Sequence, residues 1–129
     1  MTEQDHYLES VLHPAFIERE GSVLFAGHLT KELLESQWKQ LLRHDPERAE
    51  RTINHIHLGD LSDKVAVQLL LGQRIQQVWF ETLDEGFPDR EFSIALTRTT
   101  RDGEVEWLLD LWTHRRSEVQ GDDQVGLMV

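Results

Sequence analysis

The dipeptide Asp102-Gly103 constrains the fold more than any other feature of this chain. It lies between two segments in which apolar and polar residues alternate, and such alternation is typical of half-buried strands. Asp-Gly is a preferred pair for the two-residue type I′ turn, because both of its positions need a positive φ angle. We therefore predict a β-hairpin with strands over about residues 91–100 and 104–113.

A turn centred on Asp102-Gly103 also sets the register of the two strands, since a shift by one residue would exchange their faces. The predicted cross-strand pairs are Thr100 with Val105, Arg98 with Trp107, Leu96 with Leu109, and Ile94 with Leu111. The aliphatic pairs share one face, which we expect to point into the core. The opposite face carries Ser93, Ala95, Thr97, Thr99, Glu106, Leu108, Asp110 and Trp112.

Leu108 and Trp112 are the large apolar residues of this second, otherwise polar face. Two interpretations of the face remain open. In a small sheet it can be open to water, and an exposed patch centred on tryptophan often marks an association surface. Alternatively, the N-terminal helix or the C-terminal segment covers it. On the first interpretation, Leu108 and Trp112 are candidate partner-binding residues.

Helical spacing of apolar residues predicts two helices before residue 45. The first covers residues 2–12 and is limited by Pro14, and the second has Thr30 as a suitable N-cap. The apolar stripe of the second helix comprises Leu34, Trp38, Leu41 and Leu42. Between the two helices, residues 22–26 form a strand candidate that is flanked by glycines.

The pair Asp45-Pro46 indicates the start of another helix. Asp45 suits the N-cap, and Pro46 suits the first helical position, where the missing N–H costs nothing. The residues that follow leave two alternatives open, because two isoleucines alone do not define a period. A helix can continue to Gly59, or a strand can run over residues 52–58.

The last helix has the clearest pattern, with Ser62 as predicted N-cap, Gly86 as predicted end and Pro88 just beyond. Its polar arc comprises Gln73, Arg74, Gln77, Glu81 and Asp84. The apolar arc is wider, so we place this helix centrally, between the sheet and the other helices. Gln68 and Gln76 fall inside the apolar arc, where a buried amide needs a partner. They are either hydrogen-bonding core residues or polar anchors of a ligand-binding cleft.

These patterns predict an α+β fold, in which three to four helices pack on a small, mostly antiparallel sheet that ends in the hairpin. The sheet is expected to combine residues 22–26 with the hairpin strands, and the last helix to pack across it. A chain of 129 residues fits one domain. We assign residues 1–116 to a single globular domain and residues 117–129 to a flexible C-terminal tail.

The composition argues against several classes of function. The chain has no cysteine, which excludes disulfides and thiolate metal sites. Its formal net charge of −11 would repel a phosphate backbone, so we expect no nucleic-acid partner. No apolar run approaches the ~20 residues of a membrane span, and the acidic N-terminus does not resemble a signal peptide. We expect a cytoplasmic protein that has no membrane partner and no cofactor.

The segment from His55 to Asp60 is the main candidate for metal chemistry. On a strand, the pattern of His55 and His57 places both imidazoles on one side, and Asp60 could then complete a metal site. On a helix the two rings would diverge by roughly 200°. In that case they are surface histidines near a helix C-terminus, where a partial positive charge is favourable.

Three functions follow from these observations. The first is a non-enzymatic interaction or regulatory module that acts as a homodimer or on a partner with a basic surface. It depends on the acidic composition, the lack of a catalytic motif and the face with Leu108 and Trp112. The second is a small-molecule binding protein, with a cleft between the last helix and the sheet. The third is a metal-dependent enzyme that uses His55, His57 and Asp60.

Overall fold

The computed structural model describes residues 2–29 and 38–114. Its helices are α1 (Glu3–Leu12), α3 (Trp38–His44), α4 (Pro46–Ile53) and α5 (Val65–Gly86), with short 3-10 turns η1 (Ala26–His28) and η2 (Leu58–Asp60). Its strands are β1 (Phe16–Arg19), β2 (Ser22–Phe25), β3 (Ile56–His57), β4 (Phe92–Arg101) and β5 (Glu104–Thr113). The predicted α+β class is confirmed, whereas the predicted N-cap Thr30 and the predicted tail 117–129 lie outside the described residues. No described helix is both long and apolar enough to cross a lipid bilayer.

The C-terminal hairpin has the predicted turn and the predicted register. Asp102 and Gly103 have φ angles of 53° and 81°, the positive values that a type I′ turn needs. The four predicted pairs all occur, from Thr100 opposite Val105 at the turn to Ile94 opposite Leu111 near the strand ends. The inner face, formed by Ile94, Leu96, Leu109 and Leu111, is buried. The core-facing row of the hairpin is therefore confirmed.

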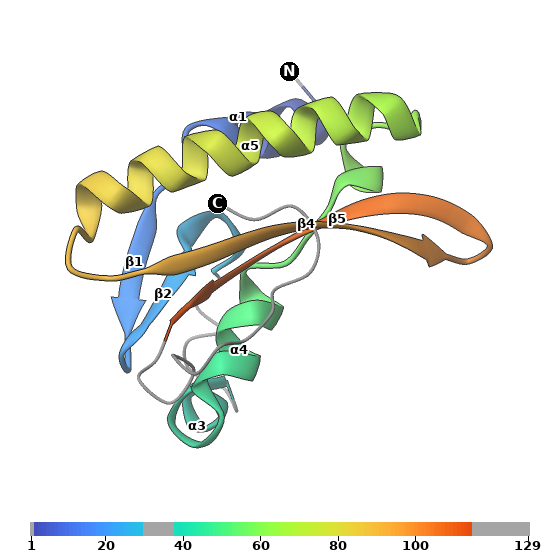
Figure 1. Cartoon of the computed structure of the whole chain (residues 1–129). Helices are drawn as coiled ribbons and strands as arrows, with labels where there is room; N and C mark the ends of the chain where they lie inside the picture. The colour runs from blue at the N-terminus through green and yellow to red at the C-terminus, as the bar shows by residue number, and fades with distance from the viewer. Residues whose placement is uncertain (1, 30–37, 115–129) are drawn as a thin grey trace.

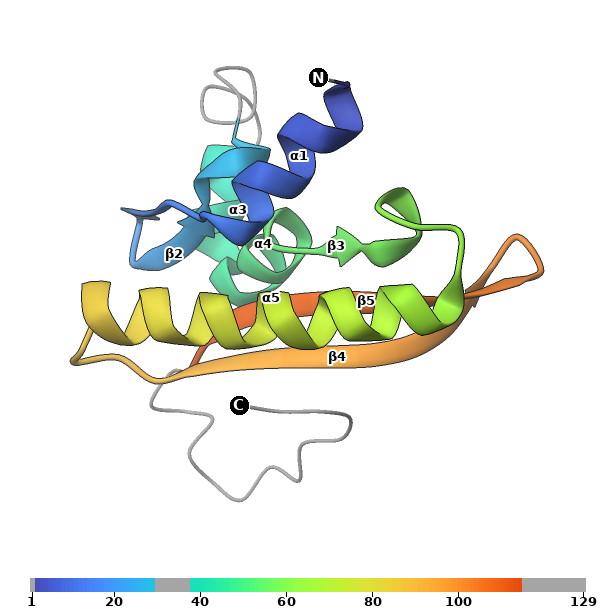
Figure 2. The ribbon, with the colours of Figure 1, turned by 90° about the horizontal axis from the view of Figure 1, so that it is seen from above.

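The hairpin lies between two groups of helices (Figures 1 and 2). α5 runs along its inner face, and α4 packs against β5 from the other side. α1 packs beside α5, where the indole N–H of Trp79 donates to the carbonyl oxygen of Val11 at 2.9 Å. The main core comprises Val11, Val23, Phe25, Ile56, Leu58, Ile75, Trp79, Leu83, Ile94, Leu96, Leu109 and Leu111.

The strand β2 belongs to a second sheet, so the prediction that it joins the hairpin is wrong. It pairs with β1 in an antiparallel hairpin, whereas β3, β5 and β4 form the three-stranded sheet. The turn between β1 and β2 has positive φ angles at Glu20 and Gly21, 52° and 83°. β1 has no counterpart among the predicted elements, because four residues are too few to show alternation.

Two side chains, one from α4 and one from the residue after it, fill the space between β2 and β5. Glu50 is fully buried and accepts from the N–H of Val23 at 2.8 Å and from the N–H of Thr113 at 2.5 Å. Asn54 accepts from the N–H of Phe25 at 2.7 Å and donates to the carbonyl oxygen of Val23 at 2.9 Å. These side chains hydrogen-bond the free edge of β2, so β2 forms no direct ladder with β5.

The segment after Asp45-Pro46 divides into a helix and a strand. Asp45 caps α4 by accepting from the N–H of Arg48, as predicted, but the helix ends at Ile53 instead of continuing to Gly59. Asn54, directly after the helix, makes the contacts with β2. Ile56–His57 then pairs with β5 in an extended conformation, so the strand alternative is right for the second part of the segment.

α5 begins at Val65, three residues after the predicted N-cap Ser62. The N–H of Lys64 donates to the hydroxyl of Ser62 at 3.2 Å, and the side-chain amide of Gln68 donates to the Ser62 carbonyl at 2.8 Å. Ser62 therefore forms the turn before the helix and does not cap its first residues. The end at Gly86 and the packing across β4 and β5 agree with the prediction. The predicted position between the sheet and the other helices is only partly right, because α1 packs against α5 whereas α4 lies on the other side of the hairpin (Figure 1).

Candidate functional site

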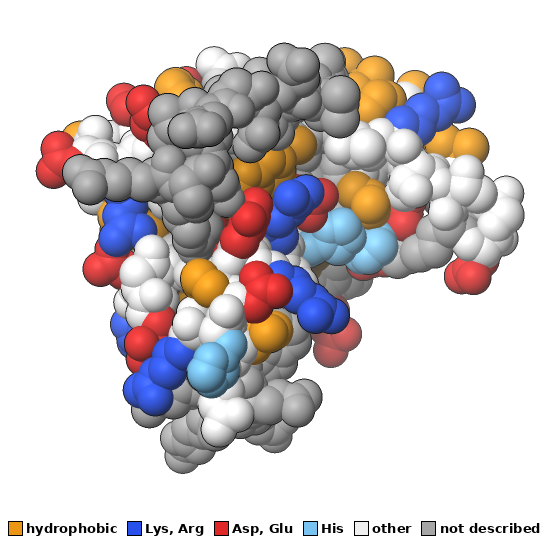
Figure 3. Space-filling model, turned by 60° about the horizontal axis from the view of Figure 1, so that its bottom comes forward, with side chains coloured by type: hydrophobic (Ala, Val, Ile, Leu, Met, Phe, Trp, Pro, Cys, Tyr) orange, Lys and Arg blue, Asp and Glu red, His pale blue; other side chains and the backbone are white. Residues whose placement is uncertain are grey.

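The outer face of the hairpin is covered at Trp112. This side chain is 6% exposed, and the guanidinium of Arg51 on α4 lies 4.2 Å from the centre of its ring. Leu108 is half-buried and pairs with His57 of β3. The interpretation of this face as open to water is therefore wrong at Trp112, because α4 packs across the end of β5. On the side of the molecule shown in Figure 3, a histidine cluster lies among acidic and basic side chains.

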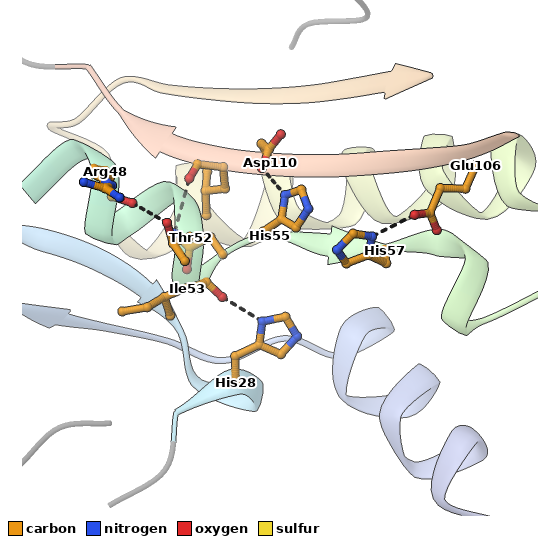
Figure 4. A network of polar contacts seen from close by, with 10 residues as sticks. His28, Arg48, Thr52, Ile53, His55, His57, Glu106 and Asp110 are labelled. Carbon is orange, nitrogen blue, oxygen red and sulfur yellow. Dashed lines mark hydrogen bonds and ion pairs between the residues drawn. The ribbon is translucent and has the colours of Figure 1, made fainter. Parts of the chain in front are cut away.

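Two histidine–carboxylate pairs lie on this outer face (Figure 4). His55 Nδ1 is 2.5 Å from Asp110 Oδ1, and His57 Nδ1 is 2.9 Å from Glu106 Oε1. His57 lies in β3 and His55 directly before it, and their ring centres are 4.6 Å apart in an edge-to-face arrangement. The hydrogen bond to Asp110 raises the pKa of His55 above its usual value of 6.5, and burial opposes this effect.

A third histidine, His28, joins η1 to α1 and α4. Its Nδ1–H donates to the carbonyl oxygen of Ile53 at 2.7 Å, and its Nε2 accepts from the hydroxyl of Tyr7 at 2.5 Å. This pattern requires the neutral ring, and burial lowers the pKa of His28 accordingly. Burial, together with the negative charge of Asp60, raises the pKa of Tyr7 to about 12. His28 is therefore a structural hydrogen-bonding residue in this fold.

The structure does not bring the predicted metal ligands together. His55 and His57 orient toward Asp110 and Glu106, while the backbone carbonyl of Asp60 accepts from the side chain of Gln4. Among residues 2–29 and 38–114, no group of three or more histidine and carboxylate side chains is placed to hold a metal ion.

Gln68 and Gln76 both connect α5 to the sheet. The Gln68 side-chain oxygen accepts from the N–H of Trp107 at 2.9 Å, and the Gln76 amide donates to the carbonyl oxygen of Ile94 at 2.6 Å. Both side chains are buried. A polar cavity of about 110 Å³ lies beside Gln68, between η2 and the turn end of β5. The contacts of the two glutamines are those of hydrogen-bonding core residues.

The outward face of α5 carries exposed apolar side chains that sequence reasoning missed. Leu70 is 66% exposed, Phe80 45% and Val67 38%, and in the described part of the chain these are all the large hydrophobic residues with such exposure. At 100° per residue, Leu70 lies about 20° from Gln77, at the centre of the predicted polar arc. Phe80 lies about 60° from Gln77 in the opposite direction, about 20° beyond Gln73 at the edge of that arc. The helical projection therefore contained a signal, namely a leucine inside the polar arc and a phenylalanine just beyond its edge.

A cavity of about 250 Å³ opens next to Phe80, between the C-terminal end of α5 and the nearby ends of β4 and β5. Its walls comprise Phe80, Leu83, Asp84, Arg90, Glu91, Phe92 and His114. The Arg90 guanidinium forms an ion pair with Glu18 and donates to the carbonyl oxygen of Gly21 at 2.7 Å. These segments meet only in the folded chain, so local patterns did not predict the cavity.

Comparisons with known proteins reveal no relative: no family model matches the chain, and no curated protein or solved structure is significantly similar to it.

Proposed function

We propose that this chain is a non-enzymatic protein-interaction module that binds a partner with a basic surface through the outward face of α5. The observation that carries the proposal is the exposure of Leu70, Phe80 and Val67 on one helix. An isolated exposed leucine is ordinary, but Val67 and Leu70 are exposed one turn apart, and Phe80 is exposed about 15 Å further along the same helix. Large apolar side chains exposed along one helix favour an association site. We call this surface the α5 face and define it by these three residues.

The charge of the chain favours a basic partner over a second copy. The formal net charge is −11, and two copies would repel each other as they approach. The acidic residues Glu81 and Asp84 lie on the exposed side of the same helix, beside the apolar residues. An apolar centre with charged surroundings is the usual anatomy of a protein interface, in which the charges steer the partner and select it.

The histidines and glutamines singled out above have structural partners. The two histidine–carboxylate pairs join β3 and the residue before it to β5. Gln68 and Gln76 join α5 to the sheet. Such contacts stabilise and position the elements. In contrast, the apolar side chains of the α5 face gain nothing from their exposure in the isolated chain, because burial of the part of each that is still exposed would release roughly 0.5–2 kcal/mol.

The test uses the full chain and three synthetic amphipathic peptides that share one length. The first carries leucines on one face and lysines on the other, the second replaces each lysine with glutamate, and the third replaces each leucine with serine. Titrations followed by the amide spectrum of ¹⁵N-labelled chain should give saturable shifts along α5 for the leucine–lysine peptide alone.

Two variants make this test specific. Leu70→Ser should weaken binding of the leucine–lysine peptide by about tenfold, because burying a leucine that is 66% exposed is worth about 1–2 kcal/mol. Its effect on the midpoint of urea unfolding should be small, since the side chain is already mostly exposed. Thr97→Val, on an exposed position of β4, is the control and should leave binding unchanged. Equal binding of the glutamate peptide, or shifts confined to the outer face of the hairpin, would refute the proposal.

A further inference from the structure

The geometry points to the cavity beside Phe80 as a socket for an arginine side chain of the basic partner, an inference that rests on the proposed function. The cavity lies where α5 ends and β4 begins, at the yellow end of α5 in Figure 1. Its volume of about 250 Å³ is below the ~300–1,000 Å³ of pockets that enclose whole drug-sized ligands. It therefore has room for a single long side chain.

The walls of the cavity match the two parts of an arginine side chain. Phe80, Leu83 and Phe92 supply apolar and aromatic surface for the aliphatic stem and for stacking of the planar guanidinium. Asp84 and Glu91 supply carboxylates, which can accept paired N–H bonds from that group. Phe80 belongs to both the cavity and the α5 face, so one partner segment can contact both.

The position of the acidic residues supports a cationic occupant. Glu81, Asp84 and Glu85 lie in the last turns of α5, and no basic residue lies in its last turn. The C-terminal end of a helix carries partial negative charge, so carboxylates there are unfavourable for the isolated chain. A guanidinium bound at this end interacts favourably with both the carboxylates and the helix dipole. The binding of a cation thus accounts for an arrangement that helix stability alone opposes.

Arg90 already lies in the cavity wall, but the cavity still favours a cationic occupant. The Arg90 guanidinium is held by Glu18 and by the Gly21 carbonyl, which directs it toward β1 and the turn after it. His114 contacts the hydroxyl of Ser93 through Nε2, and its Nδ1 is 3.8 Å from Glu91. Asp84 makes no ion pair within the described residues. Within residues 2–29 and 38–114, the carboxylates of Asp84 and Glu91 therefore outnumber the cations that remain to balance them.

The direct test uses small probes, so that it does not depend on the rest of the α5 face. N-acetyl-arginine methylamide is titrated into the full ¹⁵N-labelled chain, and its uncharged citrulline analogue and N-acetyl-glutamate methylamide are titrated in parallel. We expect saturable shifts around Phe80 and Phe92 for the arginine probe only. Asp84→Asn and Glu91→Gln should each weaken its binding by about two- to fivefold. Glu104→Gln is the matched control, because it removes one charge at the far end of the hairpin.

Several results would overturn the inference. Equal binding of the citrulline probe would show that the cation is not recognised, and preferred binding of the glutamate probe would make the cavity an anion site. An equal loss of affinity for the arginine probe in Glu104→Gln would show that the effect depends on net charge alone and not on the cavity. A dimer by light scattering that Phe80→Ala dissociates would assign the cavity to a second copy. Tighter probe binding after combined replacement of Arg115 and Arg116 by alanine would assign it to the chain's own arginines.

The two proposals fail separately. If the leucine–lysine peptide binds in a Leu70-dependent way but the arginine probe does not bind, the socket is wrong and the interaction module stands. If the arginine probe binds at Phe80 but Leu70→Ser leaves peptide binding unchanged, the α5 face is wrong as the contact surface.

Discussion

Replacement of Glu50 by alanine should destabilise the protein more than any other single change of a charged residue discussed above. Glu50 is fully buried between β2 and β5 and accepts from the backbone N–H groups of Val23 and Thr113. It also accepts from the hydroxyl of Thr113 at 2.7 Å. Alanine would leave two buried N–H groups without this acceptor, while the hydroxyl can rotate to another one.

The expected loss follows from the desolvation of those groups. Each buried donor left without a partner costs about 1–3 kcal/mol, so two of them cost about 2–6 kcal/mol. Domains have a total stability of about 5–15 kcal/mol, so Glu50→Ala should remove a large share of it. Glu50→Gln should also destabilise, because the amide retains one acceptor oxygen but turns an NH₂ group toward one of the N–H donors.

Urea unfolding of the full chain measures this loss through the fluorescence of the buried Trp79 and Trp112. The midpoint of Glu50→Ala should fall strongly at an unchanged slope, since the unfolded surface is the same. Arg48→Ala is the control, because Arg48 is exposed on the same helix and alanine is an equally good helix former. A loss below about 1 kcal/mol in Glu50→Ala would refute the role of α4 as the bridge between the sheets.

Three further results are expected. Gly72→Ala should cost about 1–3 kcal/mol in urea unfolding, because its Cβ would lie 2.6 Å from a methyl of Leu96, whereas Gly86→Ala, with no atom within 4 Å, should cost nothing. Gly103→Ala should shift the thermal midpoint down, because its φ of 81° is in the region that disfavours side chains. The raised pKa of His55 means that its protonation stabilises the fold fully below pH 6.5, and that this gain is lost as pH rises through the folded value. Asp110→Asn should therefore destabilise most at acidic pH, and a difference in unfolding free energy that grows with pH would contradict the assignment.

The candidate site was predicted only in part. Gln68 and Gln76 were recognised as buried amides, and their hydrogen bonds to the Trp107 N–H and the Ile94 carbonyl support the core alternative. The imidazoles of His55 and His57 do lie close together, but their carboxylate partners come from β5 and not from Asp60. The spacing within a segment shows which side chains are parallel, whereas their partners depend on which strand lies alongside.

The α5 face was missed for a different reason. Its residues are visible in the helical projection, since Leu70 lies at the centre of the polar arc. Most residues of this arc are polar, which indicates a solvated face, and Leu70 stands in the sequence between two leucines that resemble part of the apolar arc. The exposure of Leu70 and Phe80 depends on where α1 and the hairpin cover the helix, and this is a property of the packed structure.

Local sequence was sufficient for the C-terminal hairpin, because Asp102 and Gly103 both accept positive φ angles and the alternation on either side allows one register. It was also sufficient for the starts of α1 and α4, where short-range side-chain caps fix the first turn. The partner of β2, the end of α4 at Ile53 and the cover over Trp112 were decided by packing. Each of these depends on groups far apart in the chain, such as Glu50 with Thr113, whose pairing no local pattern specifies.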